Sequence, residues 1–150
     1  MKKARFFTKL MLTLVLLITF EGNLIAQEFQ LIKIAESITI RYKPKSEMIL
    51  RDSTFKAMKL NFAQYREAIL LALEDSTLTE FKVCSKEMHL RIGDFAWMLL
   101  RELQKIPKDC SIRSFNTYRG MCFFPVGLLD HMEKHRLAVA ADLRECVPME

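Results

Sequence analysis

The stretch that decides the fold is LRIGDFAWMLL, Leu90 to Leu100, in which Gly93 and Asp94 separate two apolar runs. An acid directly before an apolar run is typical of a helix N-cap, whose carboxylate accepts hydrogen bonds from the first free amides. Gly93 would supply a turn conformation that other residues resist. We therefore expect Asp94 to be a helix N-cap rather than a ligand-binding acid, and its replacement by alanine to cost about 1 kcal/mol.

The segment after this corner predicts the centre of the core. FAWMLLRELQKI, residues 95–106, is apolar almost all the way round its first two turns, which indicates a helix buried on most sides. Pro107 would end it. Before the corner, apolar residues alternate with polar ones, which predicts short extended pieces or a hairpin. They are Phe81, Val83, Met88, Leu90 and Ile92.

Two further helices are predicted. From Phe62 onwards, apolar residues recur at three- and four-residue intervals, which predicts a helix that ends near Asp75. Ser53 or Asn61 would cap it, and Arg66 would project into solvent from its polar side. Pro125 fits the first turn of a second helix. This helix would run to about residue 147, either unbroken or with a break near His135.

Residues 27–42 are ambiguous. Ile38, Ile40 and Tyr42 alternate as in a strand, whereas Leu31, Ile34, Ala35 and Ile38 would share one face of a helix. We favour a helix reaching the Pro44 region, followed by a short helix within residues 45–50. Only three glycines follow residue 26, and sandwiches and barrels need more turn residues. The predicted fold class is therefore mainly α: a small helical bundle with minor short extended segments.

The N-terminus has the pattern of a secretory signal peptide. Four basic residues precede an apolar run of about eleven residues, Leu10 to Phe20, whereas a membrane-spanning helix needs roughly 20. Cleavage after Ala26 would leave residues 27–150 as a single domain, exported to the periplasm or the extracellular space. An uncleaved membrane anchor is the alternative.

Charge does not favour nucleic-acid binding. The chain has 23 basic and 18 acidic residues, but residues 27–150 alone have 19 and 17. The positive excess is therefore partly a targeting feature. We expect no nucleic-acid partner, and membrane contact only through residues 1–26.

Four cysteines follow the leader: Cys84, Cys110, Cys122 and Cys146. In an exported protein an even number permits two disulfides, with three possible connectivities among which the sequence does not choose. Buried free thiols are the alternative, because a free cysteine packs as a small apolar residue.

Few chemistries are indicated. No GxxxxGK, GxGxxG, GxSxG or CxxCH motif is present. His131 and His135 would lie one turn apart on a helix and could contact zinc or copper, but a specific site needs three or four ligands. Cys84 with His89, or Cys122 with His131, could form a thiol–imidazole pair only if folding brought them together. We predict no cofactor, no metal site and no catalytic residue.

Residues 112–124 mix basic and aromatic side chains: Arg113, Phe115, Tyr118 and Arg119. Such a loop can contact a partner protein, although aromatic residues in a loop also pack beneath it. If the chain has an interaction surface, the sequence predicts it here.

FKVCSKEMHLRIGDFAWMLL and the later FPVGLLDHMEKHR together resemble a group of small exported proteins of Bacteroidetes type. The likeness covers Phe81 to Arg136 and implies export and helical character, with no activity. The function that the sequence predicts is an exported structural or protein-interaction module, whose partner would be another envelope or extracellular protein. A small metal-binding or thiol-dependent enzyme that uses His131, His135 and the cysteines is the alternative from another class.

Overall fold

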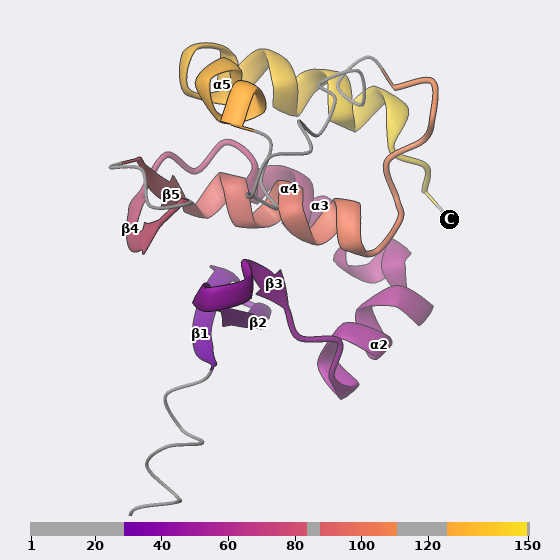
Figure 1. Cartoon of the computed structure of the whole chain (residues 1–150). Helices are drawn as coiled ribbons and strands as arrows, with labels where there is room; N and C mark the ends of the chain where they lie inside the picture. Colours follow the sequence, from indigo (N-terminus) through magenta and orange to yellow (C-terminus); the bar gives the residue numbers. More distant parts are fainter. Residues whose placement is uncertain (1–28, 84–87, 111–125, 150) are drawn as a thin grey trace, which may run out of the picture.

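The computed structural model describes residues 29–83, 88–110 and 126–149, which form a mixed α/β fold (Figure 1). Five strands in two antiparallel sheets accompany the helices of the described part. The predicted mainly helical bundle is therefore wrong. The difference lies chiefly in the first third of the domain, where the chain forms strands.

Sheet A is built from β1 (Gln30–Ala35), β2 (Ile38–Lys43) and β3 (Met48–Ile49), in that order. A 3₁₀ turn, η1 (Pro44–Ser46), connects β2 to β3. Alternate residues of the sheet are buried: Ile32, Ile34, Ile38, Ile40, Tyr42 and Ile49. The helix predicted up to the Pro44 region is wrong because β-branched residues at every second position favour a strand with one buried face. The short helix predicted within residues 45–50 is wrong as well, since η1 and β3 occupy that segment.

The helices of the middle of the chain agree more closely with the sequence. Helix α2 (Ser53–Leu60) is capped by Asp52, whose Oδ1 accepts a hydrogen bond of 3.0 Å from the Phe55 amide. Of the two predicted cap residues, Ser53 is instead the first residue of α2, and Asn61 stands at the N-cap of the next helix without a side-chain cap hydrogen bond. Helix α3 (Phe62–Ala72) ends three residues before Asp75.

The predicted hairpin is confirmed as sheet B. Strand β4 (Leu78–Lys82) pairs with β5 (His89–Arg91), so that Leu78 lies opposite Arg91 and Lys82 opposite His89. Helix α4 (Ile92–Glu102) follows without a loop, and every residue from Gly93 to Leu100 is buried, as expected for the central helix. Helix α4 ends before Pro107. Just after its last turn, Gln104 takes a left-handed conformation with φ of 61°, and the Lys105 amide donates a hydrogen bond to the Leu100 carbonyl.

The last helix, α5 (Val126–Cys146), changes direction at His135, whose φ of −132° is not helical. This is the predicted break. Helices α3 and α4 form a middle layer, with sheet A on one side and α5 on the other (Figure 1). No helix within the described ranges is long and apolar enough to cross a membrane.

Three aromatic rings join the layers at the centre of the core. Tyr42 of β2, Phe81 of β4 and Phe95 of α4 contact one another edge to face, with ring centroids 4.9 to 5.8 Å apart. Burial, with a smaller contribution from the Glu47 carboxylate, raises the pKa of the Tyr42 hydroxyl above its ordinary value. The cluster connects both sheets to the central helix.

Candidate functional site

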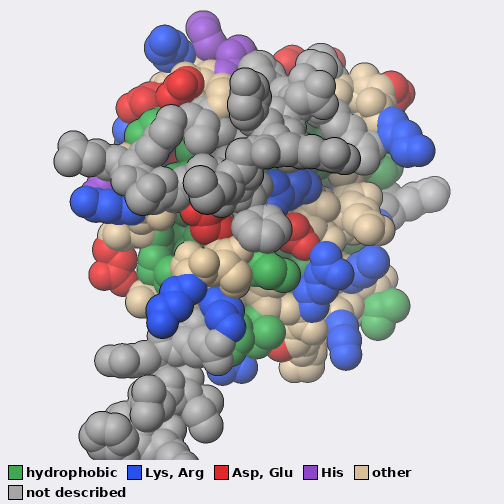
Figure 2. Space-filling model, in the orientation of Figure 1, with side chains coloured by type: hydrophobic (Ala, Val, Ile, Leu, Met, Phe, Trp, Pro, Cys, Tyr) green, Lys and Arg blue, Asp and Glu red, His purple; other side chains and the backbone are tan. Residues whose placement is uncertain are grey.

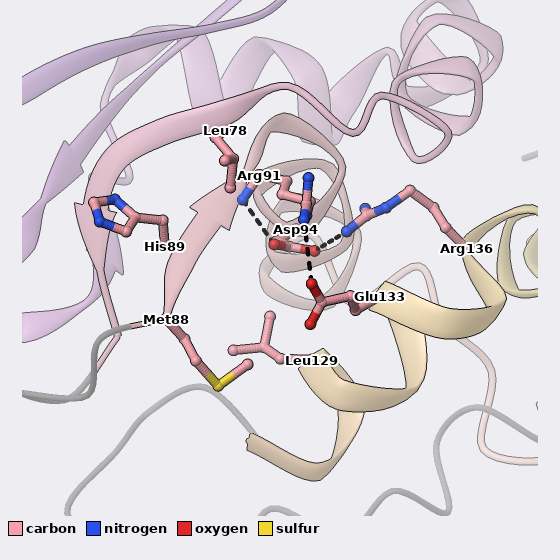
Figure 3. A pocket seen from close by; sticks show the side chains of 8 residues that line it. All are labelled: Leu78, Met88, His89, Arg91, Asp94, Leu129, Glu133 and Arg136. Carbon is pink, nitrogen blue, oxygen red and sulfur yellow. Dashed lines mark hydrogen bonds and ion pairs between the residues drawn. The ribbon is translucent and has the colours of Figure 1, made fainter.

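A cavity of about 330 Å³ lies where sheet B, the first turn of α4 and the middle of α5 meet (Figure 3). Four charged side chains line it: Arg91 comes from β5, Asp94 from α4, and Glu133 and Arg136 from α5. Leu78, Met88 and Leu129 supply its apolar wall. Residues that are more than 40 positions apart in the chain thus converge on one small space.

The deepest contact of the site is a buried ion pair. An oxygen of Asp94 (Oδ1) lies 2.8 Å from Nη2 of Arg136, and the two side chains are 3% and 9% exposed. The other carboxylate oxygen accepts a 2.7 Å hydrogen bond from the Arg91 amide, and Nη1 of Arg136 donates to the Leu73 carbonyl at 3.3 Å. Both oxygens of the carboxylate therefore have donors, which is what stabilises a charge away from water.

Asp94 is not the N-cap that the sequence predicts. Helix α4 begins at Ile92, with Arg91 as the preceding cap residue, so Asp94 lies in the first turn. Its carboxylate still accepts a hydrogen bond from a backbone amide at the helix start, but the amide is that of Arg91. The larger difference is Arg136, a partner 42 residues away that no local pattern indicates.

Gly93 has a packing role rather than the predicted turn conformation. Its amide donates to the Asp75 carbonyl at 2.9 Å, and among the described glycines none has positive φ. A Cβ placed on Gly93 would overlap Nη1 of Arg136 and the Leu73 carbonyl. The glycine therefore allows the end of α3 and the Arg136 side chain to approach the start of α4.

The rim of the cavity is more exposed. Nη2 of Arg91 lies 3.3 Å from the Glu133 carboxylate, with the two side chains 25% and 56% exposed, and Nη1 of Arg91 donates to the Ser76 carbonyl at 2.7 Å. His89, also on the rim, has Nδ1 2.9 Å from the Thr79 carbonyl, which can only accept, so Nδ1 is the donor. The four charged side chains of the cavity are thus paired with each other.

The predicted metal candidates lie close together but form no complete site. The rings of His131 and His135 have centroids 4.8 Å apart at the break in α5. Within the described ranges, no three residues among His, Cys, Asp and Glu converge to hold a metal ion. Two imidazoles alone fall short of the three or four protein ligands of a specific zinc site.

Cys110 and Cys146 are bonded to each other, with Cα atoms 5.8 Å apart, and join the segment after α4 to the end of α5. Cys84 and Cys122 lie outside the described residues. So do residues 1–26 and the predicted interaction loop with Arg113, Phe115, Tyr118 and Arg119.

Arg66 is a second side chain whose role the sequence does not reveal. Its predicted solvated position is wrong: Nη2 donates to the carbonyls of Arg144 and Val147 at 2.8 and 2.9 Å. The guanidinium thereby satisfies carbonyls at the end of α5 that have no partner within the helix. Its place on the polar side of α3 gave no sign of this contact.

Comparisons of the chain with protein families, with curated protein sequences and with solved structures found no match.

Substitution of Asp94 distinguishes the buried pair from a simple cap. Removing one partner of a buried pair leaves the other charge uncompensated, so we expect Asp94→Ala to lower the free energy of unfolding by about 3–5 kcal/mol. A cap alone would give about 1 kcal/mol. Urea denaturation followed by circular dichroism measures the difference. The double variant Asp94→Leu with Arg136→Met should recover most of the loss, and a loss near 1 kcal/mol without recovery would contradict the assignment.

Gly93 and Gly127 form a matched pair for a second test. We expect Gly93→Ala to destabilise the protein by about 3 kcal/mol, because the added methyl group meets a backbone carbonyl and a buried guanidinium. A Cβ on Gly127, in α5, would meet nothing within 4 Å, so Gly127→Ala should be neutral or stabilising by up to about 1 kcal/mol. Thermal unfolding of both variants gives the comparison, and equal effects would exclude a packing role for Gly93.

Proposed function

We propose that this protein is an exported interaction module that binds another envelope or extracellular protein through the rim of the cavity between sheet B and α5. The observation that carries the proposal is how the charged side chains of the cavity are paired and how exposed each pair is. Asp94 and Arg136 are paired and buried. Arg91 and Glu133 form a longer pair, in which Arg91 is half-buried and Glu133 exposed, and Leu78 on the same rim is 60% exposed. Arginine is enriched at protein–protein interfaces, and a partner that covered Arg91 would also bury Leu78 beside it.

Export is supported by the sequence of the leader and by the cysteines. Four basic residues, a short apolar run and a small residue at position 26 form the pattern of a cleaved signal peptide. Bonding of Cys110 to Cys146 is compatible with an oxidising compartment, where disulfides persist. An envelope protein that keeps Leu10–Phe20 as an anchor is the alternative that a mass measurement separates.

The competing proposal, a small metal-binding or thiol-dependent enzyme, has less support. His131 and His135 lack a third ligand in the described part of the chain, and Cys146 is bonded to Cys110. Catalysis by a thiol needs a thiolate, which a disulfide does not supply.

Intact mass tests export. We expect the protein recovered from outside the cytoplasm, alkylated without reduction, to have the mass of residues 27–150 with no alkyl group. Proteolysis without reduction should then release a peptide pair that joins Cys110 to Cys146. The full-length mass with four alkyl groups would mean a retained leader and free thiols, and would overturn this part of the proposal.

Site-specific photocrosslinking in cells tests the interaction. We expect a photoreactive residue at Leu78 to give a discrete protein adduct, because this side chain is exposed at the rim. Leu60 of α2, which is 84% exposed and does not line the cavity, is the matched control and should give no such adduct. The change Arg91→Glu should abolish the Leu78 adduct. Adducts of equal yield at both positions, or none at Leu78, would contradict the proposed surface.

A further inference from the structure

Positive charge is concentrated in one part of the fold. Residues 30–60, which form sheet A and α2, have seven basic and three acidic residues, whereas residues 61–150 have twelve and thirteen. The positive excess of the domain therefore belongs to this part alone. Figure 2 shows Lys and Arg side chains gathered on the lower part of the face in view, over sheet A and α2.

The solvent side of sheet A combines these charges with apolar side chains. We call it the outer face, defined by Leu31, Lys33, Thr39, Arg41 and Met48. Leu31 lies directly opposite Arg41, and Lys33 opposite Thr39, so both cations share one surface. Leu31 is 72% exposed and Met48 46% exposed on this same surface. The inner side is covered by α3 and α4, which leaves the outer face to water in the described part of the chain.

The aromatic ring of Phe29 lies beside a cation of the outer face. The Phe29 ring lies 5.6 Å from the guanidinium carbon of Arg41 and 5.5 Å from the ammonium of Lys43. Such contacts hold cations beside an apolar group.

We propose that the outer face of sheet A docks on the anionic surface of a phospholipid membrane. Lys33 and Arg41 would pair with lipid phosphates, while Leu31 and Met48 would enter the boundary between headgroups and acyl chains. Cations beside shallow apolar side chains are the composition that binds anionic bilayers. The exposed apolar side chains of Leu31 and Met48 favour a membrane over an acidic protein as the occupant, because charge pairing with an acidic protein would not need them. Residues 1–26 are the only membrane contact that the sequence predicts, and the outer face adds a second.

Flotation with lipid vesicles tests the proposal. The probe is the chain from Gln27 onwards, which retains the described core because its buried apolar residues begin at Ile32. We expect it to float with vesicles of phosphatidylcholine containing about three parts in ten of phosphatidylglycerol, and not with phosphatidylcholine alone. Raising the salt from about 50 to about 500 mM should release most of it, because screening shortens the reach of surface charges.

Two double variants with the same change in net charge locate the binding surface. Lys33→Glu with Arg41→Glu should weaken vesicle binding at least about tenfold. Lys82→Glu with Lys134→Glu reverses two exposed charges on sheet B and α5, away from sheet A, and should change it less than about threefold. Circular dichroism checks that both variants are folded.

Three outcomes would overturn the proposal. Equal weakening by both double variants would mean that net charge alone binds the lipid. Absence of binding to anionic vesicles at low salt would exclude the membrane, and binding to polyglutamate but not to vesicles would assign the outer face to an acidic protein. The two proposals fail independently. If no adduct forms at Leu78 but the protein still binds anionic vesicles, the proposed function is rejected and the membrane-binding surface stands.

Discussion

The ion pair between Asp94 and Arg136 is almost wholly removed from water, and three helices are arranged around it. Moving both groups out of water is costly, so the pair is tolerated only where additional hydrogen bonds complete the surroundings of each. The Arg91 amide and the Leu73 carbonyl do so, and the missing side chain of Gly93 makes room for the guanidinium. The end of α3, the start of α4 and the middle of α5 are thereby fixed against one another.

Helix α5 depends on the Asp94–Arg136 pair because it is the last helix of the chain and packs on only one side, against the α3–α4 layer. Arg66 binds the carbonyls at its end, and the Cys110–Cys146 bond holds the same end to the segment after α4. The buried pair fixes its middle, close to the break at His135. A helix held at its middle and at its end has one position on the domain, which keeps the cavity in a defined shape.

The sequence predicts the parts of the fold in which local pattern and tertiary packing agree. The burial of Phe95–Leu100 follows from an apolar helix, and the pairing of β4 with β5 follows from alternation around Phe81 and Leu90. Residues 27–42 fit helical and strand periodicities alike, and the strand forms because its alternate isoleucines, among them Ile32 and Ile34, pack against the helices. Neither Arg136 nor Arg66 is recognisable, because their partners lie 42 or more residues away and a charged residue on a helix is usually solvated. The cavity rim is not recognisable either, because Glu133 lies 42 residues from Arg91, whereas the position of Asp94 at a helix start follows from the local sequence without its partner.

The position of sheet A and α5 on opposite sides of the α3–α4 layer gives the molecule two ends of different character (Figure 1). A domain that rests on a charged surface through sheet A turns its other side, with α5 and the cavity rim, towards the aqueous space. The α3–α4 layer then separates the surface that rests on the charged surface from the surface that faces the partner. Such a polarity would make the protein a one-sided platform: fixed in orientation by where it lies, and open to its partner only from the direction that faces away.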